Sequence, residues 1–245
     1  MNSNYTKANS SIWSGRIDST HDLSAFRIHQ IVKCIDINIS TKENLALKAK
    51  NYCLLGFCCD EGVKRNKGRI GASEGPKAIR KALSSLPLHF TEEVQLYDAG
   101  DVSCKDQNLE KAQQSLSKVI DHILTLGMYP IIMGGGHEIA FGSFKGTFGF
   151  LQKQNPKTKL GILNFDAHFD LRPYQETTSS GTMFSQIADN RLEGAELDYA
   201  KSQELDMLVP MEKSCGDVCE VECCTKELTD TDMKYIALSF KILSM

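Results

Sequence analysis

The sequence of 245 residues lacks the features that mark several classes of protein. It contains no apolar run near the roughly 20 residues that span a bilayer, and its first residues lack the apolar segment of a secretory signal. Its net charge of −3 gives no electrostatic reason to expect nucleic acid or an anionic membrane as a partner. We therefore expect a globular protein with neither of these partners.

The sequence also lacks a recognisable disulfide or zinc framework. Its nine cysteines are odd in number and follow no export signal, which favours reduced thiols in the cytoplasm. Four of them cluster near the end of the chain: Cys215, Cys219, Cys223 and Cys224. This cluster lacks the paired C-x-x-C spacing of structural zinc sites, so it does not favour a metal there.

No linker rich in proline, glycine or serine and no internal repeat interrupts the chain, so we predict one domain over residues 1–245 with a loose polar lead at 1–11. Short apolar strands are predicted at 51–59, at 94–97, from Tyr129 and from Leu160; helices are predicted at 26–32, 73–86 and 107–126. The last helix has the clearest 3.6-residue apolar stripe, with Asp106 to cap its start and Gly127 to end it. Alternating strands and helices predict an α/β fold with parallel strands and right-handed crossovers.

Acids and an imidazole follow the predicted strand near Leu160, in the stretch NFDAHFD. Side chains two apart share a face in an extended chain, so Asp166, His168 and Asp170 are expected to converge on one side. Oxygen ligands mixed with imidazole suit a divalent first-row metal such as manganese. Taken alone, a polar turn that closes a strand explains the pattern equally well.

A second stretch upstream, GGGHE, favours the metal interpretation. Gly134, Gly135 and Gly136 allow close backbone approaches, and His137 follows where a strand gives way to a helix. Ligand sites in open α/β sheets lie at this edge. Two strand ends that both carry metal-type ligands predict one shared site.

Four stretches together resemble the arginase (ureohydrolase) superfamily. They are GGGHEIA at 134–140, NFDAHFDLRP at 164–173, TTSSGTMF at 177–184 and GRIGASEGPKAIRKAL at 68–83. Within that superfamily, WSGRIDS and LLGFCCDEGVKRNKGR make the sequence most similar to the formimidoylglutamase family. The resemblance covers about residues 13–199.

This resemblance implies a three-layer αβα fold with a mainly parallel sheet and two Mn2+ ions at its carboxyl edge. It implies hydrolysis of N-formimidoyl-L-glutamate to L-glutamate and formamide by a metal-bound hydroxide, in histidine catabolism. By position, the implied metal ligands are His137, Asp166, His168 and Asp170. Asp170 is also the implied catalytic residue, because it would orient the attacking hydroxide.

A substrate with two carboxylates needs cationic or backbone donors near the metals. The predicted substrate-binding residues are Arg172, Ser179, Ser180 and Gly181. Arginases carry a histidine shortly after the Ser-Ser-Gly stretch, and GTMFSQIADN has none, which argues against arginase itself. The alternative is another ureohydrolase, such as an agmatinase. The chain could be a homo-oligomer.

The sequence departs from the family pattern in residues 200–245, which we expect to be divergent and to lack the last family elements. A third motif, Ser-x-Asp-x-Asp, normally supplies two more carboxylates, whereas here Ser239 is followed by Phe240 and Lys241. Two Mn2+ ions, a hydroxide and two aspartates leave the cluster at +1, where two further aspartates would bring it to −1. We therefore predict one retained metal at best, or a second held weakly.

The missing acids affect both the activity and the stability that we expect of this chain. Glu138, Glu176 and Asp101 are the carboxylates that could replace them. Without a replacement, the alternative to an active hydrolase is an impaired or inactive metal-binding remnant. A shortened sheet would also leave an unpaired edge and an exposed apolar face.

Overall fold

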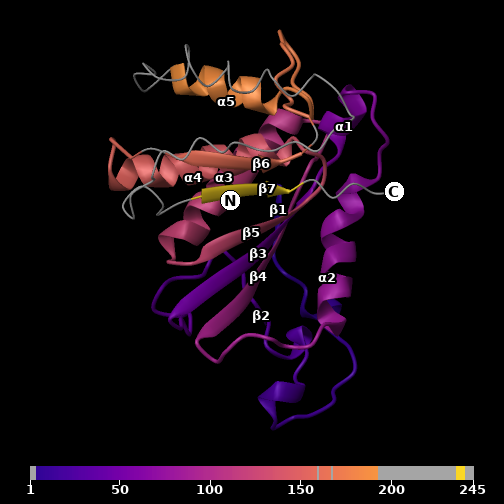
Figure 1. Ribbon diagram of the computed structural model, residues 1–245, viewed down its shortest axis with the longest axis vertical. Coiled ribbons are helices and arrows are strands. Elements are labelled where there is room, and N and C mark those ends of the chain that lie inside the picture. Colours follow the sequence, from indigo (N-terminus) through magenta and orange to yellow (C-terminus); the bar gives the residue numbers. More distant parts are fainter. Residues whose placement is uncertain (1–3, 159, 167, 193–235, 241–245) are drawn as a thin grey trace, which may run out of the picture.

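The computed structural model of the chain describes residues 4–158, 160–166, 168–192 and 236–240. Two sheets lie in this part of the chain (Figure 1). The larger contains β1 (Tyr5–Thr6), β2 (Lys33–Cys34), β3 (Lys50–Cys58), β4 (Val94–Ser103) and β5 (Tyr129–Gly134). The smaller contains β6 (Gly161–Phe165) and β7 (Ile236–Phe240). The helices are α1 (Glu61–Arg65), α2 (Gly75–Ser85), α3 (Leu109–Thr125), α4 (Ile139–Gln154) and α5 (Met183–Leu192).

The larger sheet is parallel except at one edge. Its order is β1-β4-β3-β5, with β2 also paired to β4, and only β1 runs antiparallel. The chain passes from β3 to β4 through α2 and from β4 to β5 through α3, which brings β5 to the opposite side of β3. The carboxyl ends of β3, β4 and β5 therefore meet at one edge, where ligand sites of open α/β sheets lie.

Helices cover both faces of this sheet, so the predicted three-layer α/β fold is confirmed (Figure 1). Alternate residues of β3 point to opposite faces. Cys53, Leu55 and Phe57 join the core that contains the apolar stripe of α3. Leu54 joins a second core with Trp13 on the face covered by α2. Burial on both faces explains why this strand has a nearly continuous apolar sequence.

Helix α3 follows the predicted apolar stripe but starts later than predicted. Asn108 caps it, because its side chain accepts a hydrogen bond from the Lys111 N–H. The prediction of Asp106 as the cap was wrong, since that residue has a φ of 54° and lies in the preceding turn. The predicted end is confirmed by Gly127, whose φ of 84° is a conformation that glycine adopts without strain.

Two predictions for the N-terminal region were wrong. The lead is not loose from residue 4 onward, because Tyr5 pairs with the end of β4 and its hydroxyl donates to the Ala99 carbonyl at 2.7 Å. The predicted helix at 26–32 is a 3-10 turn at Ile28–Gln30 followed by the short strand β2. Pairing with β4 determines the conformation of both segments, and such a long-range contact cannot be predicted from local apolar periodicity.

Strand β4 extends six residues beyond the predicted end at Tyr97 because its polar residues are paired internally. Asp98 and Asp101 accept hydrogen bonds from Arg80 of α2, so these carboxylates stay in the sheet. Arg80 belongs to the stretch GPKAIRKAL, and its contacts give that part of the motif a structural role.

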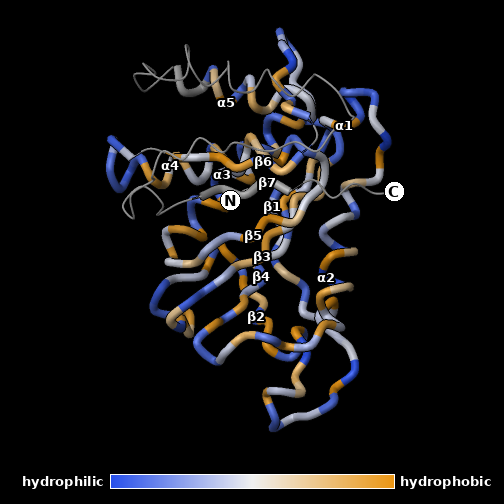
Figure 2. The backbone as a smooth tube through the Cα atoms, viewed as in Figure 1, coloured by the Kyte–Doolittle hydropathy of each residue, from blue (hydrophilic) through white to orange (hydrophobic). Residues whose placement is uncertain are grey.

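Large apolar side chains are exposed on the two strands that precede the candidate ligands. They are Tyr129 and Ile131 of β5, and Leu163 and Phe165 of β6. Figure 2 shows the hydrophobic stretch along β5. The predicted exposed apolar face is therefore present at these residues. None of the described helices is long and apolar enough to cross a membrane.

Candidate metal centre

The glycines after β5 place His137 at the carboxyl edge of the larger sheet. A Cβ on Gly135 would lie 2.3 Å from the Cys59 carbonyl oxygen and 2.5 Å from that of Phe57, so only glycine fits. The Gly136 N–H donates to the Cys59 carbonyl at 2.8 Å. This close approach ties the turn to the end of β3, and α4 begins two residues after His137.

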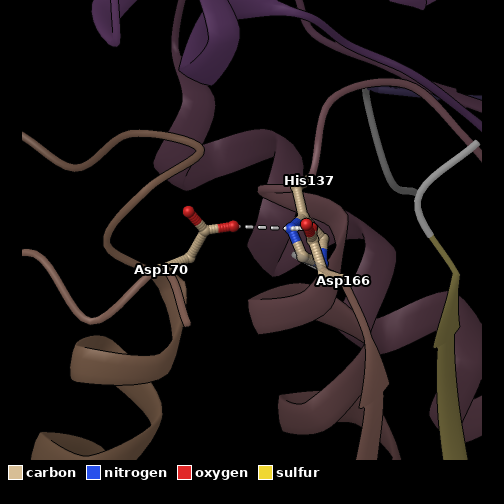
Figure 3. A group of neighbouring side chains, drawn as sticks. All are labelled: His137, Asp166 and Asp170. Atoms are coloured by element: carbon tan, nitrogen blue, oxygen red, sulfur yellow. Dashed lines mark hydrogen bonds and ion pairs between the residues drawn. The ribbon is translucent and has the colours of Figure 1, made fainter. Parts of the chain in front are cut away.

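His137, Asp166 and Asp170 form a compact cluster (Figure 3). The Nδ1 atom of His137 lies 2.8 Å from Asp170 Oδ2 and 3.1 Å from Asp166 Oδ2. One ligand atom from each residue lies within 4.8 Å of the others. The side chains of His137 and Asp166 are almost fully buried, and that of Asp170 is 12% exposed. The structure therefore brings together three of the four predicted metal ligands.

Asp170 reaches this cluster from an uncommon backbone conformation. Its φ is 49°, in the left-handed region that residues other than glycine seldom adopt, although aspartate tolerates it. Such conformations persist where the surroundings determine them, and they concentrate at functional sites. The conformation turns the chain after β6 so that this carboxylate faces His137 (Figure 3).

His168 does not join the cluster. Its side chain is 70% exposed, and its Nδ1 atom lies 3.7 Å from Asp166 Oδ1. The predicted alternation of Asp166, His168 and Asp170 on one face requires an extended chain, but β6 ends at Phe165. Beyond it, the Asp166 carboxylate accepts the His168 N–H at 3.2 Å, which makes a local turn in place of a strand.

The donor set of this cluster fits a divalent metal ion. One imidazole nitrogen and two carboxylate oxygens are ligands that suit manganese and neighbouring first-row ions. Two carboxylates so close together repel each other, and a divalent cation between them would cancel their formal charge of −2. The three described donors therefore match one divalent ion in ligand type and in formal charge.

The three carboxylates proposed as substitutes do not enter the cluster. Glu138 is fully buried beside His137, but its Oε1 atom accepts the Gly62 N–H at 2.9 Å, and burial raises the pKa of this carboxyl. Asp101 accepts a hydrogen bond from Arg80, and Glu176 is exposed. No other carboxylate of the described residues joins the group around His137.

The predicted substrate-binding residues lie together beside α1. The Arg172 N–H donates to the Gly181 carbonyl at 3.0 Å, and a Cβ on Gly181 would lie 3.1 Å from Arg172 Cδ. The Ser180 N–H donates to the Gly62 carbonyl at 3.1 Å, and Ser179 Oγ accepts the Gly181 N–H at 3.2 Å. The guanidinium of Arg172 is exposed beside this loop.

Two residues of the stretch DEGVKRNKGR, Arg65 and Asn66, were not among those predicted for this region. Its first part is the helix α1, and Asn66 just after it accepts a hydrogen bond from Arg172 Nη1 at 2.9 Å. Arg65 Nη1 donates to the Thr178 carbonyl at 3.3 Å. The signal available in the sequence was the spacing of Glu61 and Arg65, an acid and a base four residues apart, as on one face of a helix.

The predictions for the far end of the chain lie largely outside the described residues. The cysteines at 215–224 and most of 200–245 fall there. The backbone of β7 is described: it pairs in parallel with β6, with Ser239 opposite Asn164 and Phe240 opposite Phe165. The strand that carries Ser239 is therefore the neighbour of the strand that leads to Asp166.

Comparisons with known proteins agree with this architecture. Formimidoylglutamase of Clostridium tetani is 48% identical over 187 residues, which are 76% of this chain and 55% of the relative. Formimidoylglutamase of Geobacillus kaustophilus is 49% identical over 177 residues, which are 72% of this chain and 53% of the relative. The chain thus spans about half the length of these curated relatives.

Solved structures show the same fold. A variant of Trypanosoma cruzi formiminoglutamase, solved with Mn2+, is 29% identical, with a TM-score of 0.51 over 63% of this chain and 52% of that one. Formimidoylglutamase from Bacillus subtilis is 21% identical, with a TM-score of 0.50 over 77% of this chain and 61% of that one. The family model described as Arginase family matches residues 50–206, which include His137, Asp166, Asp170 and the loop at 178–181. The chain belongs to the arginase family.

Proposed function

We propose that this chain takes part in hydrolysis of N-formimidoyl-L-glutamate to L-glutamate and formamide, a step of histidine catabolism. The observation that carries the proposal is the convergence of His137, Asp166 and Asp170 from two strand ends. The high identity to proteins named formimidoylglutamase supports this choice of substrate.

In this proposal His137, Asp166 and Asp170 hold one Mn2+ ion, and His168 at the rim is available for a second, weaker one. The metal supplies Lewis-acid activation of water, which is needed because an amidine carbon is a poor electrophile. Asp170 would face the water with the oxygen that does not contact His137, and the proton that it accepts there would pass to the leaving amine of glutamate.

The loop residues recognise the carboxylates of the substrate. Arg172 supplies an exposed guanidinium, which binds a carboxylate through two parallel hydrogen bonds. Ser179 and the neighbouring backbone add polar groups beside it. A cation at this position disfavours agmatine, whose free amine carries a positive charge, and so the agmatinase alternative is the weaker one.

A second candidate is a metal-binding relative that does not turn over substrate. Ser239 lies on the strand next to β6, but the sequence continues with Phe240 and Lys241 where the family resemblance implies acids. With two carboxylates and one imidazole, the described cluster is matched to a single ion. The chemistry that the family resemblance implies uses two, so binding without hydrolysis is the expected outcome if no second ion is held beside His168.

The test is glutamate release from N-formimidoyl-L-glutamate by purified, Mn2+-loaded protein, followed with a glutamate-specific coupled assay. We expect turnover by the wild type, loss of at least about a hundredfold in Asp170→Asn, and wild-type rates in Asp106→Asn. Asp106 is an exposed aspartate outside the site, so it is a matched control. Mn2+ binding with no glutamate formed would support the second candidate.

Three further expectations accompany the proposal. They are a cytoplasmic location, a single domain over the whole chain, and a small-molecule substrate as the principal partner. Analytical ultracentrifugation of the Mn2+-loaded chain measures its oligomeric state and distinguishes a monomer from a homo-oligomer.

A further inference from the structure

The loop at residues 178–181 is held in place by neighbours far away in the sequence. The Ser180 N–H donates to the Gly62 carbonyl of α1 at 3.1 Å. The Thr178 hydroxyl donates to Glu110 Oε1 of α3 at 2.7 Å. The position of the loop therefore depends on α1 and on the first turn of α3.

Arg65 joins these two supports. It is the last residue of α1, and its side chain is 23% exposed. Its guanidinium donates to Glu110 Oε1 at 2.6 Å, to the Gln107 carbonyl at 3.0 Å and to the Thr178 carbonyl at 3.3 Å. Because the five N–H donors of arginine have a fixed planar geometry, these contacts fix α1, α3 and the loop relative to one another.

Glu110 completes the network from the other side. Its Oε1 atom accepts hydrogen bonds from both Arg65 and Thr178. Partial burial acts to raise the pKa of Glu110, but these hydrogen bonds outweigh it and hold the pKa below its usual value. The carboxylate therefore stays charged and keeps both partners at neutral pH.

Asn66 extends the same support to Arg172. It follows Arg65 directly, and its Oδ1 atom accepts a hydrogen bond from Arg172 Nη1 at 2.9 Å. Arg172 in turn donates its N–H to the Gly181 carbonyl and stands two residues after Asp170. The end of α1 thus contacts both segments that carry the substrate donors.

We propose that Arg65 is a positioning residue that orients the 178–181 loop directly, and Arg172 through Asn66, toward a small dicarboxylate substrate. The inference rests on the proposed function for the identity of that substrate. The hydrogen bonds described for Arg65 go to Glu61, Gln107, Glu110 and Thr178, none of which belongs to the metal cluster. Its loss should therefore weaken substrate binding and leave metal binding intact.

The test compares Arg65→Met and Thr178→Val with the wild type. Methionine keeps the length of the side chain without its donors, and valine keeps the shape of threonine without its hydroxyl. Thr178→Ser restores the hydroxyl and should restore wild-type behaviour. Lys153→Met is the control, because it breaks an exposed ion pair with Asp121 away from the loop.

Three quantities are measured: hydrogen exchange of peptides that cover 178–182, the Kd for Mn2+, and the KM for N-formimidoyl-L-glutamate. In Arg65→Met we expect exchange and KM to rise about tenfold, the equivalent of one charged hydrogen bond. The Kd for Mn2+ and kcat should change by less than about twofold. Unchanged exchange and KM in both variants would overturn the inference, as would a parallel loss of Mn2+ binding.

An inactive wild type would contradict the proposed function without removing this test. In that case calorimetric binding of N-formimidoyl-L-glutamate replaces KM, and hydrogen exchange is measured as before. A tenfold weaker ligand Kd in Arg65→Met, with rescue in Thr178→Ser relative to Thr178→Val, supports the positioning role. The positioning role is overturned if all variants bind the ligand as the wild type does. It is also overturned if none of the proteins, the wild type included, binds the ligand.

Discussion

Replacing Arg80 by methionine should be among the most damaging single changes in this fold. The guanidinium binds Asp98 through two hydrogen bonds of 2.8 and 2.9 Å, and it also donates to Asp101 and to the Gly100 carbonyl. The side chains of Arg80 and Asp98 are 3% and 1% exposed. In Arg80→Met, the Asp98 carboxylate would stay buried without its counter-ion.

The expected loss in the free energy of unfolding depends on the hydrogen bonds that Asp98 keeps. Breaking a buried pair by removing one partner costs about 3–5 kcal/mol. Asp98 retains hydrogen bonds from Trp13 Nε1 at 2.7 Å and from the Gly100 N–H at 2.9 Å, so the lower end applies. We expect a loss of about 3 kcal/mol in the free energy of unfolding, or roughly 6–12 °C in Tm for a chain of this length.

The assay is urea unfolding followed by circular dichroism, with the exposed pair Lys153–Asp121 as the reference. Lys153→Met should cost less than about 1 kcal/mol because its pair is solvent-screened. The double variant Arg80→Met with Asp98→Leu should recover part of the loss, since no buried charge is left unpaired. A loss below about 1 kcal/mol in Arg80→Met, or no recovery in the double variant, would refute this reasoning.

Three further predictions concern the site and its surroundings. Gly135→Ala should weaken Mn2+ binding by at least about tenfold in calorimetry, because the new Cβ would collide with the Cys59 carbonyl oxygen and displace the turn before His137; an unchanged Kd would contradict it. Cys104 should react with iodoacetamide before the other described cysteines in a mass-spectrometric time course, since a hydrogen bond with Cys59 lowers the pKa of the Cys104 thiol. The contribution of Glu110 to stability should be fully present above its usual pKa of 4.5 and be lost as the pH falls below it, because its pKa is lowered in the fold. The stability difference between wild type and Glu110→Gln in urea unfolding should therefore shrink in acid, and a difference that grows there would be the contrary result.

The parts of the fold that depend on apolar periodicity could be predicted from the sequence. The stripe of α3 and the apolar run of β3 report burial directly, since these elements pack on a core along most of their length, whereas Tyr129 and Ile131 of β5 are exposed. The second half of β4 could not be found in this way. Its acids are kept in the sheet by Arg80, a partner on another element that no local pattern reveals.

The residues of the candidate site likewise divide into those that could be predicted from the sequence and those that could not. His137, Asp166 and Asp170 were predictable, because glycine turns and acids at strand ends indicate a ligand-bearing edge. His168 was misplaced because the alternation of a strand was extended into a turn. The link between Arg65 and Glu110 was beyond sequence reasoning, since it depends on two helices meeting in the fold.

The measurement that most directly tests the central claim is the stoichiometry of Mn2+ on purified protein, by metal analysis after equilibrium dialysis. We expect one tightly bound ion per chain, which is lost in Asp166→Ala and in His137→Ala. His21→Ala and Asp106→Asn, which change exposed residues outside the cluster, should retain it. No bound Mn2+ in the wild type, or an ion retained in Asp166→Ala and His137→Ala alike, would show that these residues do not form the metal site.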